Sequence, residues 1–131
     1  MTVLRPETIT REAQGEFAHR KIFSLPAGEC SAAEFAVVSL WLEPLPRGDG
    51  IQFFGGNSIE AIPPECAEGL EEGVYEALRD GVLNGGMVVD VKITIMDAKF
   101  HELDSSRKAF RIAAKGAFAV AMRKGAPIFA N

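Results

Sequence analysis

The chain has 131 residues, which is the usual size of one domain, so we expect residues 1–131 to fold as a single unit. Hydrophobic residues make up 47% and charged residues 24%, a balance that excludes a disordered or fibrous chain. The net charge of −4 argues against bulk attraction to nucleic acid, and no apolar run approaches the ~20 residues of a membrane span. We therefore expect neither a membrane partner nor a signal peptide.

The charges are distributed unevenly along the chain. Residues 60–80 carry seven acids against one base, whereas residues 105–131 carry six bases and no acid. The two cysteines, Cys30 and Cys66, are far apart and lack CxxC spacing, so we interpret both as free thiols. Free thiols are typical of a reducing compartment, which predicts a cytoplasmic location.

The first half of the chain predicts three strands. Residues 16–23 alternate loosely between apolar and polar, residues 35–42 read FAVVSLWL, and residues 51–54 form a short apolar run. Residues 24–34 have the composition of a loop. Residues 43–50 read EPLPRGDG, where two prolines and two glycines predict a turn.

The second half predicts a helix, a strand and a helix. Residues 64–80 begin with proline and glutamate and carry apolar residues at helical spacing, which predicts a helix. Residues 87–96 read MVVDVKITIM, whose strict alternation predicts a strand with one buried face, formed by Val89 and every second residue after it. A long helix follows, with Asp104 as its N-cap and Gly125 as its stop.

Few residues of this chain suit catalysis. No glycine-rich loop ends in GK[ST], so we expect no nucleotide binding by this chain alone. His19 and His101 are too far apart in sequence for HxH or HExxH metal spacing. His101 with Glu102 and Asp104 is open to two interpretations, a weak metal or acid/base site or a solvated loop before the last helix. Cys66 lies in an acidic segment that disfavours its thiolate, so we expect no enzyme, no cofactor and no metal centre.

A basic stripe lies on the last predicted helix. Arg107, Arg111 and Lys115 are four residues apart and therefore share one helix face. Such a stripe is often only the solvated side of an amphipathic helix. The alternative is a face that contacts phosphates, which the lack of acids in residues 105–131 favours. The acidic residues of the helix at 64–80 are open to the same choice, a solvated face or a docking surface.

Several motifs occur together in an informative order. The strand at 88–95, the loop HELDSS at 101–106 and the AF pair at 109–110 are similar to the PVVD-V-K-V-T-L strand, HEVDSS loop and AF pair of one known family, and the chain thereby resembles domain IV of translation elongation factor G. The turn EPLPRG at 43–48 is similar to the family's own turn. The likeness runs in order along nearly the whole chain. The tetracycline-resistance ribosomal protection proteins carry an equivalent domain.

The resemblance implies an α+β fold, a two-layer α/β sandwich of order β-β-β-α-β-α that is like ribosomal protein domain 2 and has a left-handed βαβ crossover. It also implies a tip that enters the ribosomal decoding site. One tip loop corresponds to residues 97–104, with His101 beside the codon–anticodon duplex, where an imidazole can hydrogen-bond RNA. The phosphate-contacting helix face would be Arg107, Arg111 and Lys115. The expected ribosome- and RNA-contacting residues are Lys99, His101, Glu102, Asp104, Ser105 and Ser106.

Two features depart from the family pattern. The family's glycine-rich GGRGQYGHV-like segment is replaced by residues 24–34, which lack its arginine, glutamine, tyrosine and histidine and add Glu29 and Glu34. The family's GTPase domain is not encoded. The chain is therefore either a piece of a longer factor or a free-standing relative, and Met1 with the diverged loop favours the second.

Three functions follow from these observations. The first, which we expect, is a non-catalytic translation-factor module that engages the ribosome, with rRNA and the tRNA–mRNA duplex as partners. The second is a protein–protein or self-association module, in which the acidic and basic helices of different copies pair in a homo-oligomer. The third is a small-molecule or enzymatic site, to which no residue in the sequence points.

Overall fold

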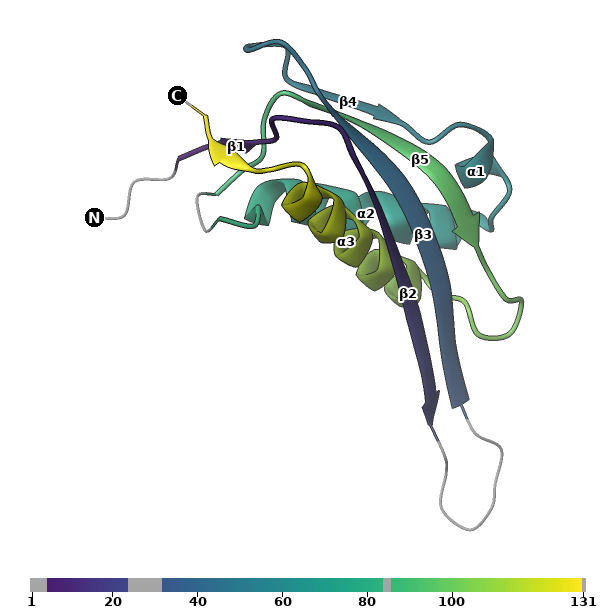
Figure 1. The fold of residues 1–131 in the computed structure, drawn as a ribbon. Coiled ribbons are helices and arrows are strands. Elements are labelled where there is room, and N and C mark those ends of the chain that lie inside the picture. The colour runs from purple at the N-terminus through teal and green to yellow at the C-terminus, as the bar shows by residue number, and fades with distance from the viewer. Residues whose placement is uncertain (1–4, 24–31, 84–85, 131) are drawn as a thin grey trace.

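A computed structural model describes residues 5–23, 32–83 and 86–130 (Figure 1). The predictions for residues 24–31, Cys30 and Glu29 among them, lie outside the described residues. The elements follow in the order β1 (Glu7–Thr8), β2 (Ala13–Phe23), β3 (Ala32–Pro44), β4 (Ile51–Phe54), α1 (Gly56–Glu60), α2 (Pro64–Asp80), β5 (Val91–Lys99), α3 (Arg107–Lys124) and β6 (Ile128–Phe129).

Four strands form the main sheet in the order β2-β3-β5-β4. β2 and β3 make a long antiparallel hairpin, and β3 also pairs antiparallel with β5. β4 runs parallel to β5, and the chain between them passes through α1 and α2 as the predicted βαβ crossover. The hand of this crossover stays a prediction. β1 and β6 form a separate two-stranded sheet, which brings the two ends of the described chain together.

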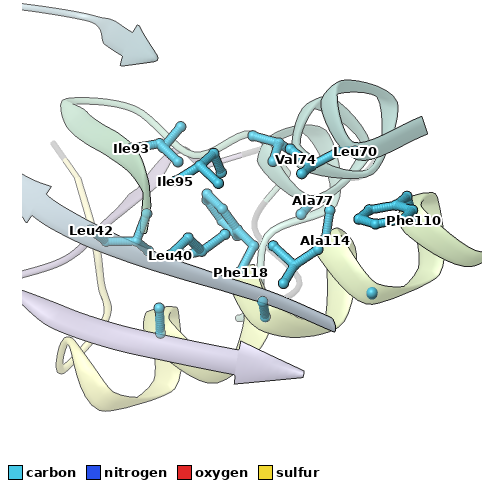
Figure 2. Packing of buried hydrophobic residues seen from close by; sticks show 14 of the residues in the cluster. Leu40, Leu42, Leu70, Val74, Ala77, Ile93, Ile95, Phe110, Ala114 and Phe118 are labelled. Atoms are coloured by element: carbon cyan, nitrogen blue, oxygen red, sulfur yellow. The ribbon is translucent and has the colours of Figure 1, made fainter. Parts of the chain in front are cut away.

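α2 and α3 lie next to each other and pack on one face of the main sheet, where they bury a shared apolar core (Figure 1). Figure 2 shows Leu40 and Leu42 of β3 and Ile93 of β5 near Phe118 of α3, with Val74 of α2 nearby. The helices form one layer and the sheet forms the other. This arrangement confirms the predicted two-layer α/β sandwich.

Two glycines allow α2 and α3 to approach each other closely. A Cβ atom at Gly69 would overlap the carbonyl group of Arg107, with the carbonyl carbon only 2.8 Å away. A Cβ at Gly73 would likewise overlap the carbonyl oxygen of Arg111 and lie 3.0 Å from the Cβ of Ala114. Only glycine at these two positions leaves room for the backbone of α3.

Most of the predicted elements are confirmed. The helix at 64–80 and the strand at 51–54 have the predicted bounds, and the strands predicted at 16–23 and 35–42 are longer than expected. The short helix α1 was not predicted, because its five residues, GNSIE, are too few to have an apolar periodicity. None of the described helices is long and apolar enough to cross a bilayer.

The strand predicted at 87–96 is wrong in its bounds, and Asp90 is the reason. Asp90 has a φ of 57°, in the left-handed region, and the chain turns there, so β5 begins only at Val91. This turn shifts the alternation, and Val88 is buried although the sequence places Val89 on the buried face. The side chain of Asp90 accounts for the turn, because its Oδ1 accepts hydrogen bonds from the backbone N–H groups of Gly48 and Gly50.

The N-cap of the last helix is also corrected. Asp104 was predicted to cap it, but the cap is Ser106, whose Oγ accepts a hydrogen bond from the backbone N–H of Ala109 at 3.1 Å. Both residue types are good N-caps, so sequence preference does not choose between them. The chain turns at residues 102–104 before the helix begins, and this turn decides the cap.

Candidate nucleic-acid interface

Residues 100–106 connect β5 to α3 and are called the tip loop below. The loop is shorter at its start than predicted, because Asp97, Ala98 and Lys99 continue β5. It lies beside the hairpin of β2 and β3, as Figure 1 shows at the right-hand end of β5. The expected contact residue Lys99 is therefore the last residue of a strand, paired in register with Val37.

Ser105 fixes the tip loop to β3. Its Oγ accepts a hydrogen bond from the backbone N–H of His101 at 2.8 Å and donates one to the carbonyl oxygen of Phe35 at 2.7 Å. The backbone N–H of Phe35 donates to the carbonyl oxygen of Asp104 at 3.0 Å. The loop therefore has a defined shape before it meets any partner, which lowers the entropy lost on binding.

The ring of His101 is an exposed polar group that the tip loop holds in place. Its Nδ1 lies 3.3 Å from the backbone N of Leu103 and 3.3 Å from Oδ2 of Asp104. In a neutral ring with its hydrogen on Nε2, Nδ1 accepts from Leu103 and Nε2–H is available as a donor. In an imidazolium, Nδ1–H donates to Asp104 instead. Both states leave one N–H of the half-exposed ring for a partner.

The six expected contact residues differ in exposure and in the contacts they make within the chain. Ser105 and Ser106 are half-buried and use their hydroxyl groups within the chain, the first for β3 and the second for α3. Asp104 is half-buried beside His101. Lys99, His101 and Glu102 are exposed at the end of β5 and in the loop. A partner would therefore meet these last three, while the serines hold the loop in shape.

The predicted basic stripe faces the acidic helix of the same chain. Arg107 lies 3.3 Å from Glu68 and also pairs with Glu72, and Arg111 lies 3.3 Å from Glu76. These pairs join residues about 35 positions apart, so the sequence alone did not connect them. The acids of α2 are thus paired with cations of α3 within one chain. The charges of these two helices therefore no longer support the hypothesis that α2 of one copy pairs with α3 of another copy.

Lys115 and Asp80 complete this row of ion pairs at 2.9 Å. The hydrogen bond from Lys115 is the main reason that the pKa of the Asp80 carboxyl is lowered, against a smaller opposing effect of burial. Each cation of the stripe thus already has an acidic partner, which reduces the positive charge that it offers to a phosphate.

Glu34 belongs to a second charged cluster that the sequence did not reveal. Its carboxylate lies 3.2 Å from Nε2 of the buried His19 and 3.4 Å from Nζ of Lys108. The hydrogen bond with His19 is the largest cause of the lowered pKa of Glu34, and Lys108 adds to it. The negative charge that Glu34 adds to residues 24–34 is therefore compensated within the chain, where the carboxylate joins β2, β3 and α3.

No group of three metal-ligating side chains occurs among the described residues. Cys66 is buried in α2 with its thiol unpaired, and burial, with the nearby Glu65 charge, raises its pKa. A raised pKa disfavours the thiolate, in agreement with the sequence analysis.

Comparison with known proteins identifies the family. The family model described as elongation factor G, domain IV, matches residues 2–126. The chain belongs to the elongation factor G domain IV family. Domain IV is a non-catalytic part of that factor, whose GTPase activity resides in another domain.

Two relatives and one solved structure give the degree of similarity. The chain is 39% identical to elongation factor G of Anaplasma phagocytophilum (strain HZ) and 42% identical to that of Ehrlichia ruminantium (strain Welgevonden), over 93% of its own length in each case. It spans only 17% of the length of these relatives. A crystal structure from Thermus thermophilus has a TM-score of 0.76 and 31% identity, with 98% of this chain and 18% of that chain covered.

Proposed function

We propose that this domain acts in translation by placing its tip loop against RNA in the decoding site of the ribosome. The partners are the rRNA and the tRNA–mRNA duplex, the place is the cytoplasm, and the action is steric rather than catalytic. The observation that carries the proposal is the tip loop, which is held to β3 by Ser105 while His101 and Glu102 remain exposed. Family membership supports the same function.

The shape of the domain suits this role. The loop lies at one end of the sandwich, and β1 and β6 lie at the other, as Figure 1 shows. The hydrogen-bonded strands β3 and β5 and the packed helices α2 and α3 lie between these ends. A displacement at one end is therefore transmitted to the other with little deformation. A rigid body with a shaped tip can occupy a site and exclude a competing arrangement of RNA without any chemical step.

The test is co-sedimentation of the chain with small ribosomal subunits. We expect saturable binding that His101→Ala weakens about 3- to 10-fold, which corresponds to one hydrogen bond. Gln52→Ala is the control, because Gln52 is an exposed polar residue of β4 outside the tip loop. Equal binding by His101→Ala and the wild type would contradict the role of the loop, and no binding by the folded wild type would contradict the proposed function.

The α3 stripe has a separate test that uses its acidic partners. Glu72→Gln with Glu76→Gln removes two acids from Arg107 and Arg111 and leaves both cations in place. If the stripe contacts phosphates, this double variant should bind the subunit more tightly than the wild type, because Arg111 loses its acidic partner and Arg107 keeps only Glu68, so both attract phosphate more strongly. Unchanged binding would limit the interface to the tip loop.

A further inference from the structure

Among the described residues near the tip loop, most cations on the helix side of the sheet are neutralised by an acid, whereas two cations on the outer face are not. On the helix side, Arg107, Arg111, Lys115 and Lys108 each lie within ion-pair distance of a carboxylate. On the opposite, outer face near the tip loop, Arg20 and Lys99 have no such partner among the described residues, and both are exposed. Two exposed cations without an acidic partner in the described part of the chain therefore lie on the outer face at this end, and Lys21, paired in register with Glu34, is a third on the helix side of β2.

The strand register places these two cations on one surface. Arg20 pairs with Phe35, and Lys99 pairs with Val37, two residues further along β3. The alternate β3 residues Ala36, Val38 and Leu40 point the other way, into the core below α3. Arg20, Phe35, Val37 and Lys99 therefore share the face that α2 and α3 leave uncovered.

An aromatic ring holds the guanidinium in place. The guanidinium carbon of Arg20 lies 5.3 Å from the ring centre of Phe35, a cation–π arrangement. Phe35 is itself bound through its backbone to Asp104 and Ser105 of the tip loop. We call Arg20, Phe35 and Lys99 the outer patch, which is joined to the tip loop by the backbone hydrogen bonds of Phe35.

The chemistry of the outer patch fits a nucleic-acid strand. Arginine binds phosphate through two parallel N–H groups, and lysine binds it as a compact point charge. Arg20 and Lys99 are two strands and two residues apart, about 12 Å at the usual strand dimensions. The two cations can therefore contact different phosphates of one strand. Glu16 and Asp97, both exposed, lie in the next register row and set an acidic boundary to the patch.

We propose that the outer patch binds the sugar–phosphate backbone of an RNA strand that continues past the tip loop. This inference rests on the proposed function for its biological setting, and it extends the contact surface from the tip loop to the outer face of the sheet, with Lys99 shared by both. Arg20 and Lys99 contact phosphates, and Phe35 fixes the orientation of Arg20. The carboxylates of Glu16 and Asp97 repel phosphates and so keep the RNA strand from extending further across the sheet.

The experiment measures binding to a labelled 12-nucleotide single-stranded RNA and, separately, to small ribosomal subunits, over a range of salt concentrations. The variant is Arg20→Gln with Lys99→Gln, which removes two exposed cations and leaves the described ion pairs intact. The matched control is Arg123→Gln with Lys124→Gln, which removes the same charge from the far end of α3. Circular dichroism verifies that both variants remain folded.

The expected result follows from counterion release. On a single strand, loss of two phosphate contacts lowers the slope of log K against log[salt] by about 1.4 in magnitude. This change corresponds to about 25-fold weaker binding at 0.1 M salt. The inference predicts this loss for the outer-patch variant on the free RNA and a parallel loss on the subunit. The control variant should stay within about twofold of the wild type.

The other outcomes separate the two proposals. The inference is overturned if the wild type does not bind free RNA. It is also overturned if the wild type and the outer-patch variant bind free RNA equally well. If the variant then still loses affinity for the subunit, the patch contacts an acidic protein surface instead. If the wild type does not bind the subunit but binds free RNA through the patch, the inference stands and the proposed function fails.

Discussion

Because α2 and α3 approach each other closely, we predict that replacing a glycine at their contact by alanine has the opposite of its usual effect on stability. In an open helix, Gly→Ala stabilises the fold by about 1 kcal/mol, because alanine restricts the unfolded backbone and favours the helix. At Gly69 the new Cβ would overlap the carbonyl group of Arg107, far inside the ~3.5 Å at which non-bonded atoms attract each other. The backbone of α3 cannot rotate away as a side chain can.

The magnitude combines these two opposing effects. Overpacking costs about 1–3 kcal/mol, and contact with a backbone carbonyl favours the upper end of that range. With about 1 kcal/mol regained from helix propensity, Gly69→Ala should destabilise the domain by about 2 kcal/mol. For a chain of this size, that loss corresponds to a Tm lower by about 6 °C. Gly73→Ala should behave in the same way, because its Cβ would overlap the carbonyl oxygen of Arg111.

The assay is equilibrium unfolding in urea, followed by far-UV circular dichroism, with a thermal scan as a second measurement. Glu71→Ala is the control, because Glu71 is an exposed residue of the same helix, and its effect should stay within ±0.5 kcal/mol or so. If Gly69→Ala were as stable as the wild type, the two helices would have to lie further apart than they do in this structure.

Three further predictions concern buried or paired groups. Glu7 is fully buried, and its Oε1 accepts hydrogen bonds from the backbone N–H groups of Val82 and Leu83, so Glu7→Ala should cost at least about 3 kcal/mol in urea unfolding. Glu34→Gln should destabilise the fold at neutral pH and approach wild-type stability in acid. The carboxylate with the lowered pKa stabilises the fold above the ordinary value of 4.5, and that stabilisation is lost as the pH falls through the lowered pKa. Cys66, in a Cys30→Ser background, should react slowly with a thiol reagent until urea unfolds the chain, because burial raises its pKa.

Each of these has an outcome that contradicts it. Glu7→Gln keeps an acceptor oxygen, so a Gln variant as unstable as the Ala variant would mean that the two N–H groups are not the cause. The free energy of unfolding of Glu34→Gln could differ from that of the wild type by the same amount from neutral to acidic pH. That result would mean that the ionised carboxylate does not stabilise the fold. Rapid labelling of native Cys66 would show that α2 opens readily.

The candidate site shows where sequence reasoning ends. The HELDSS motif indicated a loop with His101 exposed, and the structure has that loop. The sequence did not predict that Asp97 to Lys99 extend β5, because polar residues in a strand on the outer face have no apolar alternation to mark them. It also did not predict the role of Ser105, since its two partners depend on β3 lying beside the loop.

The charges illustrate the same limit. Helical spacing placed Arg107, Arg111 and Lys115 on one face, and that grouping is confirmed by their row of partners on α2. Their role was left open between a solvated face and a phosphate-contacting face, and neither interpretation included a neighbouring acidic helix. Arg20 and Lys99 were not grouped at all, because 79 residues separate them and only the pairing of β2, β3 and β5 brings them together.

The sequence by itself determined the family and most of the helices and strands, though not the short helix α1. Apolar periodicity, proline at the start of α2 and glycine after α3 act over a few residues, so they can be interpreted without knowledge of the fold. The tertiary structure alone decided which charges are neutralised, which serine caps the last helix and where β5 begins. Each of these depends on a partner that is distant in sequence, and the packing of the two helices on the sheet selects that partner.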